Sequence, residues 1–169
     1  MRQALKIVAS PFFTRVQRLL DFANDRALKA SLGHCGTDVA IWRPVAIEVP
    51  DKVFIENHVT IASFLHIWGN AGVRIGRETM IGSHVAITTA THDPDAWIMN
   101  ETLVERPVVI EHHVWIGAHA IIMPGVTIGA HAVVGAGSVV LTDVPSGSVV
   151  AGVPAKILRQ KSLSDTKSV

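Results

Sequence analysis

The chain has little cysteine, few aromatic residues and little charge, and these shortages exclude several classes of protein. Its single cysteine, Cys35, rules out a disulfide within the chain, and no cysteine pair has the spacing of a zinc site. We therefore expect a reducing, cytoplasmic setting. Charged residues make up only 17%, and 15 basic residues nearly balance 14 acidic ones. The chain therefore has no overall positive charge that would attract nucleic acid, and we expect no nucleic acid as a partner.

Long hydrophobic runs are also missing. The apolar stretch near the N-terminus is broken by Pro11 and then by charged residues, and no signal-peptide cleavage pattern follows it. A membrane-spanning helix needs about 20 apolar residues, so we expect neither a span nor a signal peptide. Hydrophobic residues still make up 49% of the 169 residues, which is typical of one folded domain with a large core.

Aliphatic residues recur every six positions from about residue 39 onward. A second apolar or small residue stands four positions after each of them, as Val59 does after Ile55, and so points to the same face of a short strand. A period of six fits neither an amphipathic helix nor a stack of hairpins. The repeat predicts an all-β solenoid in which each hexad is one strand and one corner. The regular positions are Ile55, Ile61, Ile67, Ile75, Ile81, Ile87, Ile110, Ile116, Ile122, Ile128, Val134 and Val140.

The repeat is interrupted three times. Two slips of about two residues, at Pro50-Asp51 and near Gly72, are interpreted as bulges at corners. A larger gap separates Ile87 from Ile110, so residues 93–107 are predicted to leave the solenoid as an excursion loop. Long loops on a rigid scaffold often carry function.

The two ends of the chain differ from its middle. Residues 1–31 are predicted to be helical, because apolar residues from Phe12 onward follow helical spacing. The favoured interpretation is an amphipathic helix that caps the solenoid, and a peripheral membrane contact through residues 1–30 is the alternative. The solenoid domain is expected over residues 32–159 and a flexible tail over residues 160–169.

Two short strings add to the repeat. Residues Thr89–His92 and Ala151–Lys156, together with the hexads, resemble the hexapeptide-repeat acyltransferases, most closely the maltose and galactoside O-acetyltransferases. The resemblance covers about residues 37–159. It implies a left-handed parallel β-helix with three hexads per triangular coil, acetyl-CoA as acyl donor, and a homotrimer with sites between subunits. The left hand rests on the resemblance alone, since parallel crossovers are generally right-handed.

His92 is the candidate catalytic residue. It ends the hexad begun by Ile87, directly before the excursion, where a strand would hold its side chain toward open space. In the resembled family the matching histidine is the general base. An imidazole can take the proton of an attacking hydroxyl and return it to the departing CoA thiolate. We expect direct transfer, since no serine nucleophile motif occurs and Cys35 precedes the coils.

The expected acceptor is a hydroxyl, or an amine, of a small-molecule or lipid-linked saccharide. Its predicted contacts are His84, Asp93 and Asp95. Asp93 and Asp95 adjoin the base, but Asp-Pro strings also favour plain turns. His84 stands where the resembled enzymes commonly carry Asn or Gly, so the identity of the acceptor stays open.

The expected CoA site has two kinds of residue. Ala118 and Ala136 are eighteen positions apart and should stack at one corner, leaving a groove with accessible backbone N–H groups. Basic residues near the C-terminus are placed to meet the CoA phosphates. The implied set is Trp115, Gly117, Ala118, Ala136, Leu141, Thr142, Lys156 and Arg159. The resembled enzymes usually carry Thr-Lys in place of Leu141-Thr142, so one phosphate contact is expected to be missing.

Two alternatives belong to other classes. A γ-class carbonic anhydrase-like protein shares the β-helix but binds zinc through an H-x4-H pair and a third histidine. None of His112, His113 and His119 has a histidine five positions later, so this ligand set is incomplete and no metal is expected. The second alternative is a non-catalytic β-helical scaffold, which would neither bind CoA nor release its thiol.

Overall fold

The structure is a computed structural model that describes residues 23–161, and it divides the chain into two units, Met1–Ser31 and Leu32–Val169. The described part of the first unit is a helix over residues 23–31, in which Lys29 forms a 2.8 Å ion pair with Asp25. The interpretation of residues 1–22, including the apolar face that begins at Phe12, lies outside the described residues. So does most of the predicted tail. In residues 23–161, no helix has the length and hydropathy needed to cross a bilayer.

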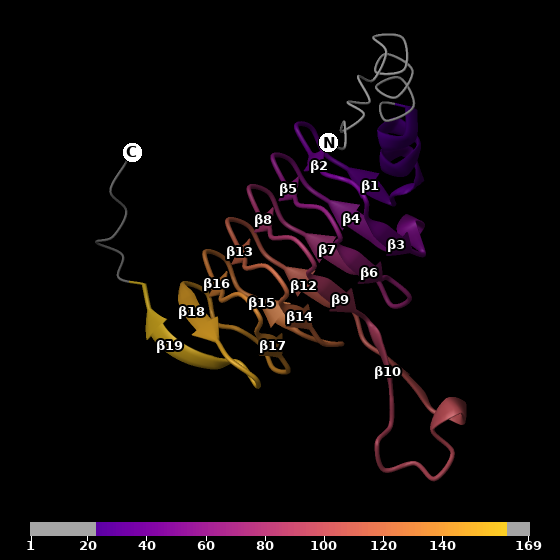
Figure 1. The fold of residues 1–169 in the computed structure, drawn as a ribbon, viewed down its shortest axis with the longest axis vertical. Helices are drawn as coiled ribbons and strands as arrows, with labels where there is room; N and C mark the ends of the chain where they lie inside the picture. Colours follow the sequence, from indigo (N-terminus) through magenta and orange to yellow (C-terminus); the bar gives the residue numbers. More distant parts are fainter. Residues whose placement is uncertain (1–22, 162–169) are drawn as a thin grey trace, which may run out of the picture. The chain divides into compact units, whose positions relative to one another are not determined.

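The second unit is a solenoid of three parallel sheets, which form the faces of a triangular prism (Figure 1). Sheet A contains β1 (His34–Cys35), β4 (Val53–Ile55), β7 (Val73–Ile75), β12 (Val108–Ile110) and β15 (Thr127–Ile128). Sheet B contains β2 (Ala40–Ile41), β5 (Thr60–Ile61), β8 (Met80–Ile81), β13 (Trp115–Ile116), β16 (Val133–Val134), β18 (Ser148–Ala151) and β19 (Lys156–Gln160). Sheet C contains β3 (Ala46–Glu48), β6 (His66–Trp68), β9 (Ala86–Thr88), β14 (Ile121–Ile122) and β17 (Val139–Val140).

The strand register follows the regular aliphatic positions of the six-residue repeat. Ile116 of β13 pairs with Ile81 of β8 on one side and with Val134 of β16 on the other. The regular aliphatic residues of successive coils therefore stack on one another along each sheet, which confirms the predicted solenoid. The earlier slips appear as longer corners, one of them the 3-10 turn η1 (Pro50–Lys52).

The core runs along the axis of the prism. The regular aliphatic positions and most of the residues four places after them point inward, and Ile55, Val59, Ile116 and Ile122 are among those fully buried. Backbone packs closely between coils, because a Cβ on Gly117 would lie 2.5 Å from the amide nitrogen of Ala136 in the next coil. Only glycine fits that close approach.

Neighbouring isoleucines of β14 give a matched test of this core. Ile122 is 0% exposed and Ile121 is 38% exposed. We expect Ile122→Ala to lower the free energy of unfolding by roughly 2–5 kcal/mol, because it removes buried methylenes and leaves a cavity. Ile121→Ala should cost about 1 kcal/mol or less. Chemical denaturation at one protein concentration measures both, and equal losses would contradict the assigned strand faces.

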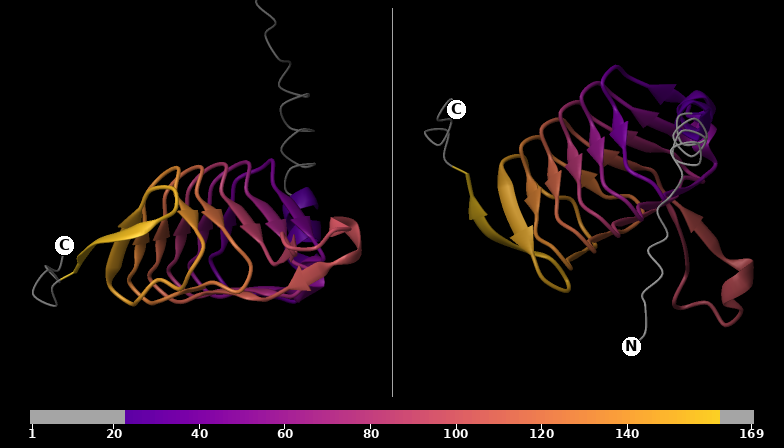
Figure 2. Two further views of the ribbon diagram at one scale, coloured as in Figure 1. Left: turned by 90° about the horizontal axis from the view of Figure 1, so that it is seen from below. Right: turned by 45° about the horizontal axis from the view of Figure 1, so that its top comes forward.

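The excursion is an antiparallel hairpin and not an irregular loop (Figure 2). Its arms are β10 (Ala90–His92) and β11 (Leu103–Glu105), and the 3-10 turn η2 (Met99–Glu101) lies between them. The expectation that it begins at Asp93 needs correction, since β10 already pairs with β11 at Ala90. His92 therefore belongs to a hairpin arm and pairs with Leu103. The reason is that the Ala90–His92 segment finds its hydrogen-bond partners in β11, not in the coil.

The C-terminal end of the solenoid also differs slightly from expectation. Strand β19 runs antiparallel to β18 and ends at Gln160, one residue past the predicted domain boundary. The amide of Lys161 then donates to the carbonyl of Gly147 at 2.8 Å. The ordered domain extends because β18 offers an edge whose backbone groups β19 pairs.

Candidate functional site

His92 is exposed, and the hairpin fixes the orientation of its ring. Its Nδ1 lies 2.7 Å from the carbonyl oxygen of Met99. A carbonyl oxygen can only accept a hydrogen bond, so Nδ1 carries the proton. In the neutral form of the ring, the lone pair is therefore on Nε2. This is the tautomer that a general base acting through Nε2 requires.

The oxygen that orients His92 is itself held in place. Met99 begins the turn η2, and its carbonyl also accepts bonds from the amide and the hydroxyl of Thr102, both at 3.1 Å. Sequence reasoning did not single out Met99. No side-chain signal marks it, because the contact uses a backbone atom that only the folded hairpin brings to His92.

Asp93 and Asp95 lie exposed in the turn that follows β10. A carboxylate oxygen of Asp93 accepts the amide of Asp95 at 3.0 Å, and the Asp93 carbonyl accepts the amide of Ala96 at 3.2 Å. Asp93 thus shapes the turn, as Asp-Pro strings often do. Their predicted contact with an acceptor stays a prediction.

His84 lies at a different corner of the prism, where sheets B and C meet. Its ring stacks between those of Phe64 and His119, with centroids 4.5 Å apart on each side. His84 precedes β9, whereas His92 follows it. One chain therefore does not bring these two predicted site residues together.

Several of the predicted CoA residues do lie together. Trp115, Gly117 and Ala118 follow one another along β13 and the next corner, and Ala136 occupies the same corner one coil later. Within residues 23–161, the amides of Ala118 and Ala136 donate to no other group. Trp115 is 53% exposed on the face of sheet B. This corner thus offers two unused N–H groups next to an exposed aromatic ring.

The remaining predicted CoA residues fall into two places. Lys156 and Arg159 lie exposed on β19, opposite Ala151 and Val149 of β18. Leu141 and Thr142 follow β17 and so lie at the corner of sheets C and A, at the other end of the sheet C strand from Ala136. The cationic pair is thus near the edge of sheet B, and Leu141-Thr142 is not.

His92 and the Ala118 corner are also separated within one chain. Ala118 precedes β14 and His92 follows β9, and these two strands are parallel neighbours in sheet C. The two features therefore lie beyond opposite ends of that sheet. A substrate that touches both would need contributions from two chains.

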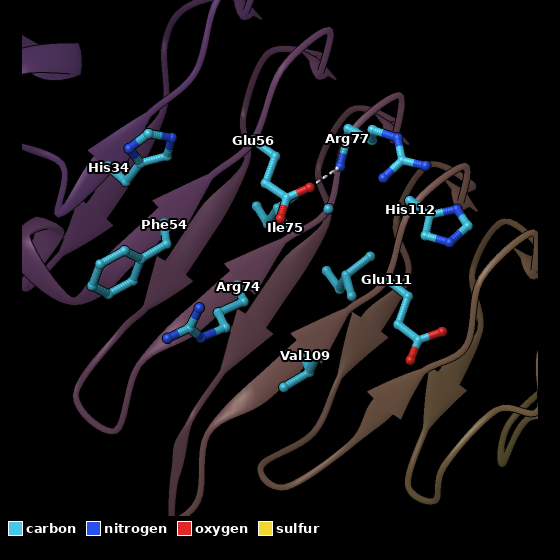
Figure 3. A pocket seen from close by; sticks show the side chains of 11 residues that line it. His34, Phe54, Glu56, Arg74, Ile75, Arg77, Val109, Glu111 and His112 are labelled. Atoms are coloured by element: carbon cyan, nitrogen blue, oxygen red, sulfur yellow. Dashed lines mark hydrogen bonds between the residues drawn. The ribbon is translucent and has the colours of Figure 1, made fainter.

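A groove lies on the outer face of sheet A (Figure 3). It is lined by charged side chains, and the Arg74 guanidinium lies 5.2 Å from the centre of the Phe54 ring. His112 stands at its edge, next to Glu111 (Figure 3). The sequence analysis assigned no site here.

Comparisons with known proteins identify the family. The family model described as bacterial transferase hexapeptide (six repeats) matches residues 107–142. The chain is 37% identical over 118 residues to the putative lipopolysaccharide biosynthesis O-acetyl transferase WbbJ of Escherichia coli, covering 64% of this chain and 60% of that protein's length.

Two solved structures are similar over most of the chain. The hexapeptide-repeat acetyltransferase VCA0836 of Vibrio cholerae, complexed with acetyl coenzyme A, is 34% identical, with a TM-score of 0.77 and 90% of each chain covered. A galactoside acetyltransferase in complex with coenzyme A is 29% identical, with a TM-score of 0.80, 85% of this chain and 72% of that one covered. The chain therefore belongs to the hexapeptide-repeat acetyltransferases, and its solenoid is their left-handed parallel β-helix.

Proposed function

We propose that this chain transfers an acetyl group from acetyl-CoA to a hydroxyl, or an amine, of a saccharide, with His92 as the general base. The observation that carries the proposal is the 2.7 Å contact between Nδ1 of His92 and the carbonyl of Met99. It leaves Nε2 of this exposed residue free to accept a proton. The names of WbbJ and of the galactoside acetyltransferase favour a sugar acceptor.

In the proposed reaction, one acetyl group passes from CoA to the acceptor, and one proton passes from the acceptor to the departing thiolate through His92. The acceptor oxygen attacks the thioester carbonyl while Nε2 of His92 takes its proton. The Met99 carbonyl then stabilises the imidazolium through the Nδ1–H bond. A backbone N–H group is suited to stabilise the tetrahedral oxyanion. When the carbon–sulfur bond breaks, the departing thiolate takes the proton back from Nε2, and the base is restored.

The proposed donor site is the corner of Ala118 and Ala136. Their unused amides can bond to the amide carbonyls of the pantetheine arm, and Trp115 would pack beside it. Lys156 and Arg159 would meet the CoA phosphates through charge-assisted bonds. Similar solved structures containing acetyl-CoA or CoA support this donor.

We further propose a homotrimer in the cytoplasm, in which the His92 hairpin of one subunit faces the Ala118 corner of the next. The separation of the two features within one chain supports this arrangement. So does the hairpin surface, where Trp97 is fully exposed and Ile98, Met99 and Leu103 are about half exposed. Large exposed apolar side chains that cluster in this way favour a partner surface.

Purified full chain should release CoA thiol when acetyl-CoA is supplied with a panel of sugar acceptors, and mass spectrometry should find the acetylated sugar. Thiol release measures donor cleavage, and the product identifies the acceptor. No thiol release with any acceptor, together with no CoA binding by calorimetry, would instead support a β-helical scaffold.

Mixed oligomers test the shared site. At acetyl-CoA concentrations well below the wild-type KM, we expect His92→Ala and Ala136→Trp each to keep at most about a tenth of wild-type activity, but their co-expression should restore about a quarter of it. In randomly mixed trimers, about one interface in four combines an intact His92 with an intact groove from its neighbour. If the site lay within one chain, the mixture would stay as inactive as either variant.

A further inference from the structure

Three histidines gather at the corner that joins sheets A and B, apart from the proposed acetyl-transfer site. His112 and His113 lie in the turn before β13, and His131 lies in the corresponding turn one coil later. One ligand nitrogen from each lies within 4.8 Å of the others. Among the described residues, this is the one group of three such side chains. The H-x4-H pattern considered in the sequence analysis does not reveal this cluster. The coil repeat instead makes neighbours of residues eighteen apart, such as His113 and His131.

The backbone holds this cluster rigidly. His113 and His131 both have a positive φ, of 57° and 61°, because they occupy equivalent corner positions in stacked coils. The amide of His131 donates to the carbonyl of His112 at 3.1 Å. The rings of His113 and His131 stack with centroids 4.8 Å apart. The positions of the ring-bearing residues are therefore set by the solenoid itself.

Glu78 orients one of the three rings. Its carboxylate lies 2.6 Å from Nε2 of His113 and can only accept a hydrogen bond, so Nε2 carries the proton. The lone pair of His113 is then on Nδ1, which lies 2.9 Å from Nδ1 of His112. A carboxylate that fixes the outer nitrogen of a histidine is the usual support behind a metal ligand.

The surroundings of His131 disfavour a proton on its imidazole. Desolvation lowers the pKa of His131, and His113, His112, Lys161 and Arg77 lower it further. Glu78 is the acidic group in contact with the cluster, since Glu111 instead accepts the amide of Ala130. The ammonium group of Lys161 donates a hydrogen bond to the backbone carbonyl of His131 and not to its ring. Neutral nitrogen ligands suit zinc and similar transition metals, and not Mg²⁺ or Ca²⁺.

We propose that His112, His113 and His131 bind one divalent transition metal ion, zinc first among them, with the fourth position open to water. Tetrahedral zinc needs ligand nitrogens about 3.3 Å apart, since each Zn–N bond is about 2.0–2.1 Å. The 2.9 Å pair opens slightly and the widest pair closes by side-chain rotation, which half-buried or exposed rings permit. The ion would join two successive coils and is assigned no role in acetyl transfer.

Zinc titration of the untagged full chain, stripped of metal by dialysis against a chelator, tests the site. Calorimetry should show one Zn²⁺ per chain, and cobalt added in its place should give the visible absorption of a nitrogen-ligated ion. His113→Asn and His131→Asn should each weaken zinc binding at least tenfold, and asparagine tolerates the positive φ at both positions. Glu78→Gln should weaken it roughly 10- to 100-fold by releasing the His113 ring.

His58→Asn is the matched control. His58 has the same positive φ of 57° at the same corner and lies 3.5 Å from the carboxylate of Asp38, but it is not part of the histidine cluster. This variant should bind zinc like the wild type. The proposal is overturned if the wild-type chain binds no zinc, or if His113→Asn and His131→Asn bind it as tightly as His58→Asn.

Discussion

Replacing His92 with alanine is expected to lower kcat for acetyl transfer by roughly 10²- to 10⁴-fold, the usual contribution of general base catalysis. Without Nε2, the acceptor hydroxyl must attack the thioester while it still holds its proton. The KM for acetyl-CoA should change little, because the proposed contacts with CoA are made by the Ala118 corner and the basic residues of β19, and not by His92. Steady-state thiol release at saturating donor and acceptor separates the two parameters.

The fold of this variant should be intact, because His92 is exposed and lies on a hairpin outside the core. Its thermal midpoint and oligomeric mass should match those of the wild type. His58→Ala serves as an activity control, since that exposed histidine has no place in the proposed acetyl-transfer site. A correctly assembled His92→Ala protein that acetylates at nearly the wild-type rate would refute His92 as the base.

Replacing Ala136 with tryptophan should raise the KM for acetyl-CoA by roughly 10- to 100-fold. The indole would occupy the corner in which the Ala118 and Ala136 amides are unused, and so displace the pantetheine arm. Loss of one or two hydrogen bonds of about 1 kcal/mol each, together with the packing around them, accounts for this range. Calorimetric titration with CoA measures the effect directly.

Ala136→Ser is the conservative control, because its small side chain leaves both the groove and the amide in place. Ala136 is exposed, so the tryptophan variant should still fold, and its circular dichroism should equal that of the wild type. If Ala136→Trp binds CoA as tightly as Ala136→Ser, the donor does not occupy this corner.

The solenoid was predictable because its repeat is a local property of the chain. Each hexad alternates inward and outward side chains over a few residues, so the burial of Ile116 or Ile122 can be inferred without knowing which strands pair. The stacking of Ile116 on Val134, eighteen residues later, then follows from the regular length of a coil without insertions. The position of His92 near the start of an excursion also followed from the interruption of the repeat.

The pairing of the excursion could not be inferred in the same way. Residues Ala90–His92 continue the apparent hexad, yet they pair with β11, and the competition between two backbone partners has no signature in side-chain periodicity. The contact of His92 with the Met99 carbonyl is hidden for the same reason, since it uses a backbone oxygen seven residues away.

The hexad pattern alone thus predicted the core, because a short period determines which side chains face inward. The three-sided coil and the choice of His92 as candidate base also needed the resemblance to the hexapeptide-repeat acyltransferases. Three features emerged only from the tertiary structure. They are the tautomer of His92, its separation from the Ala118 corner, and the meeting of His112 with His131. Each depends on distances between residues far apart along the chain or on backbone atoms, and residue type and spacing do not encode those distances.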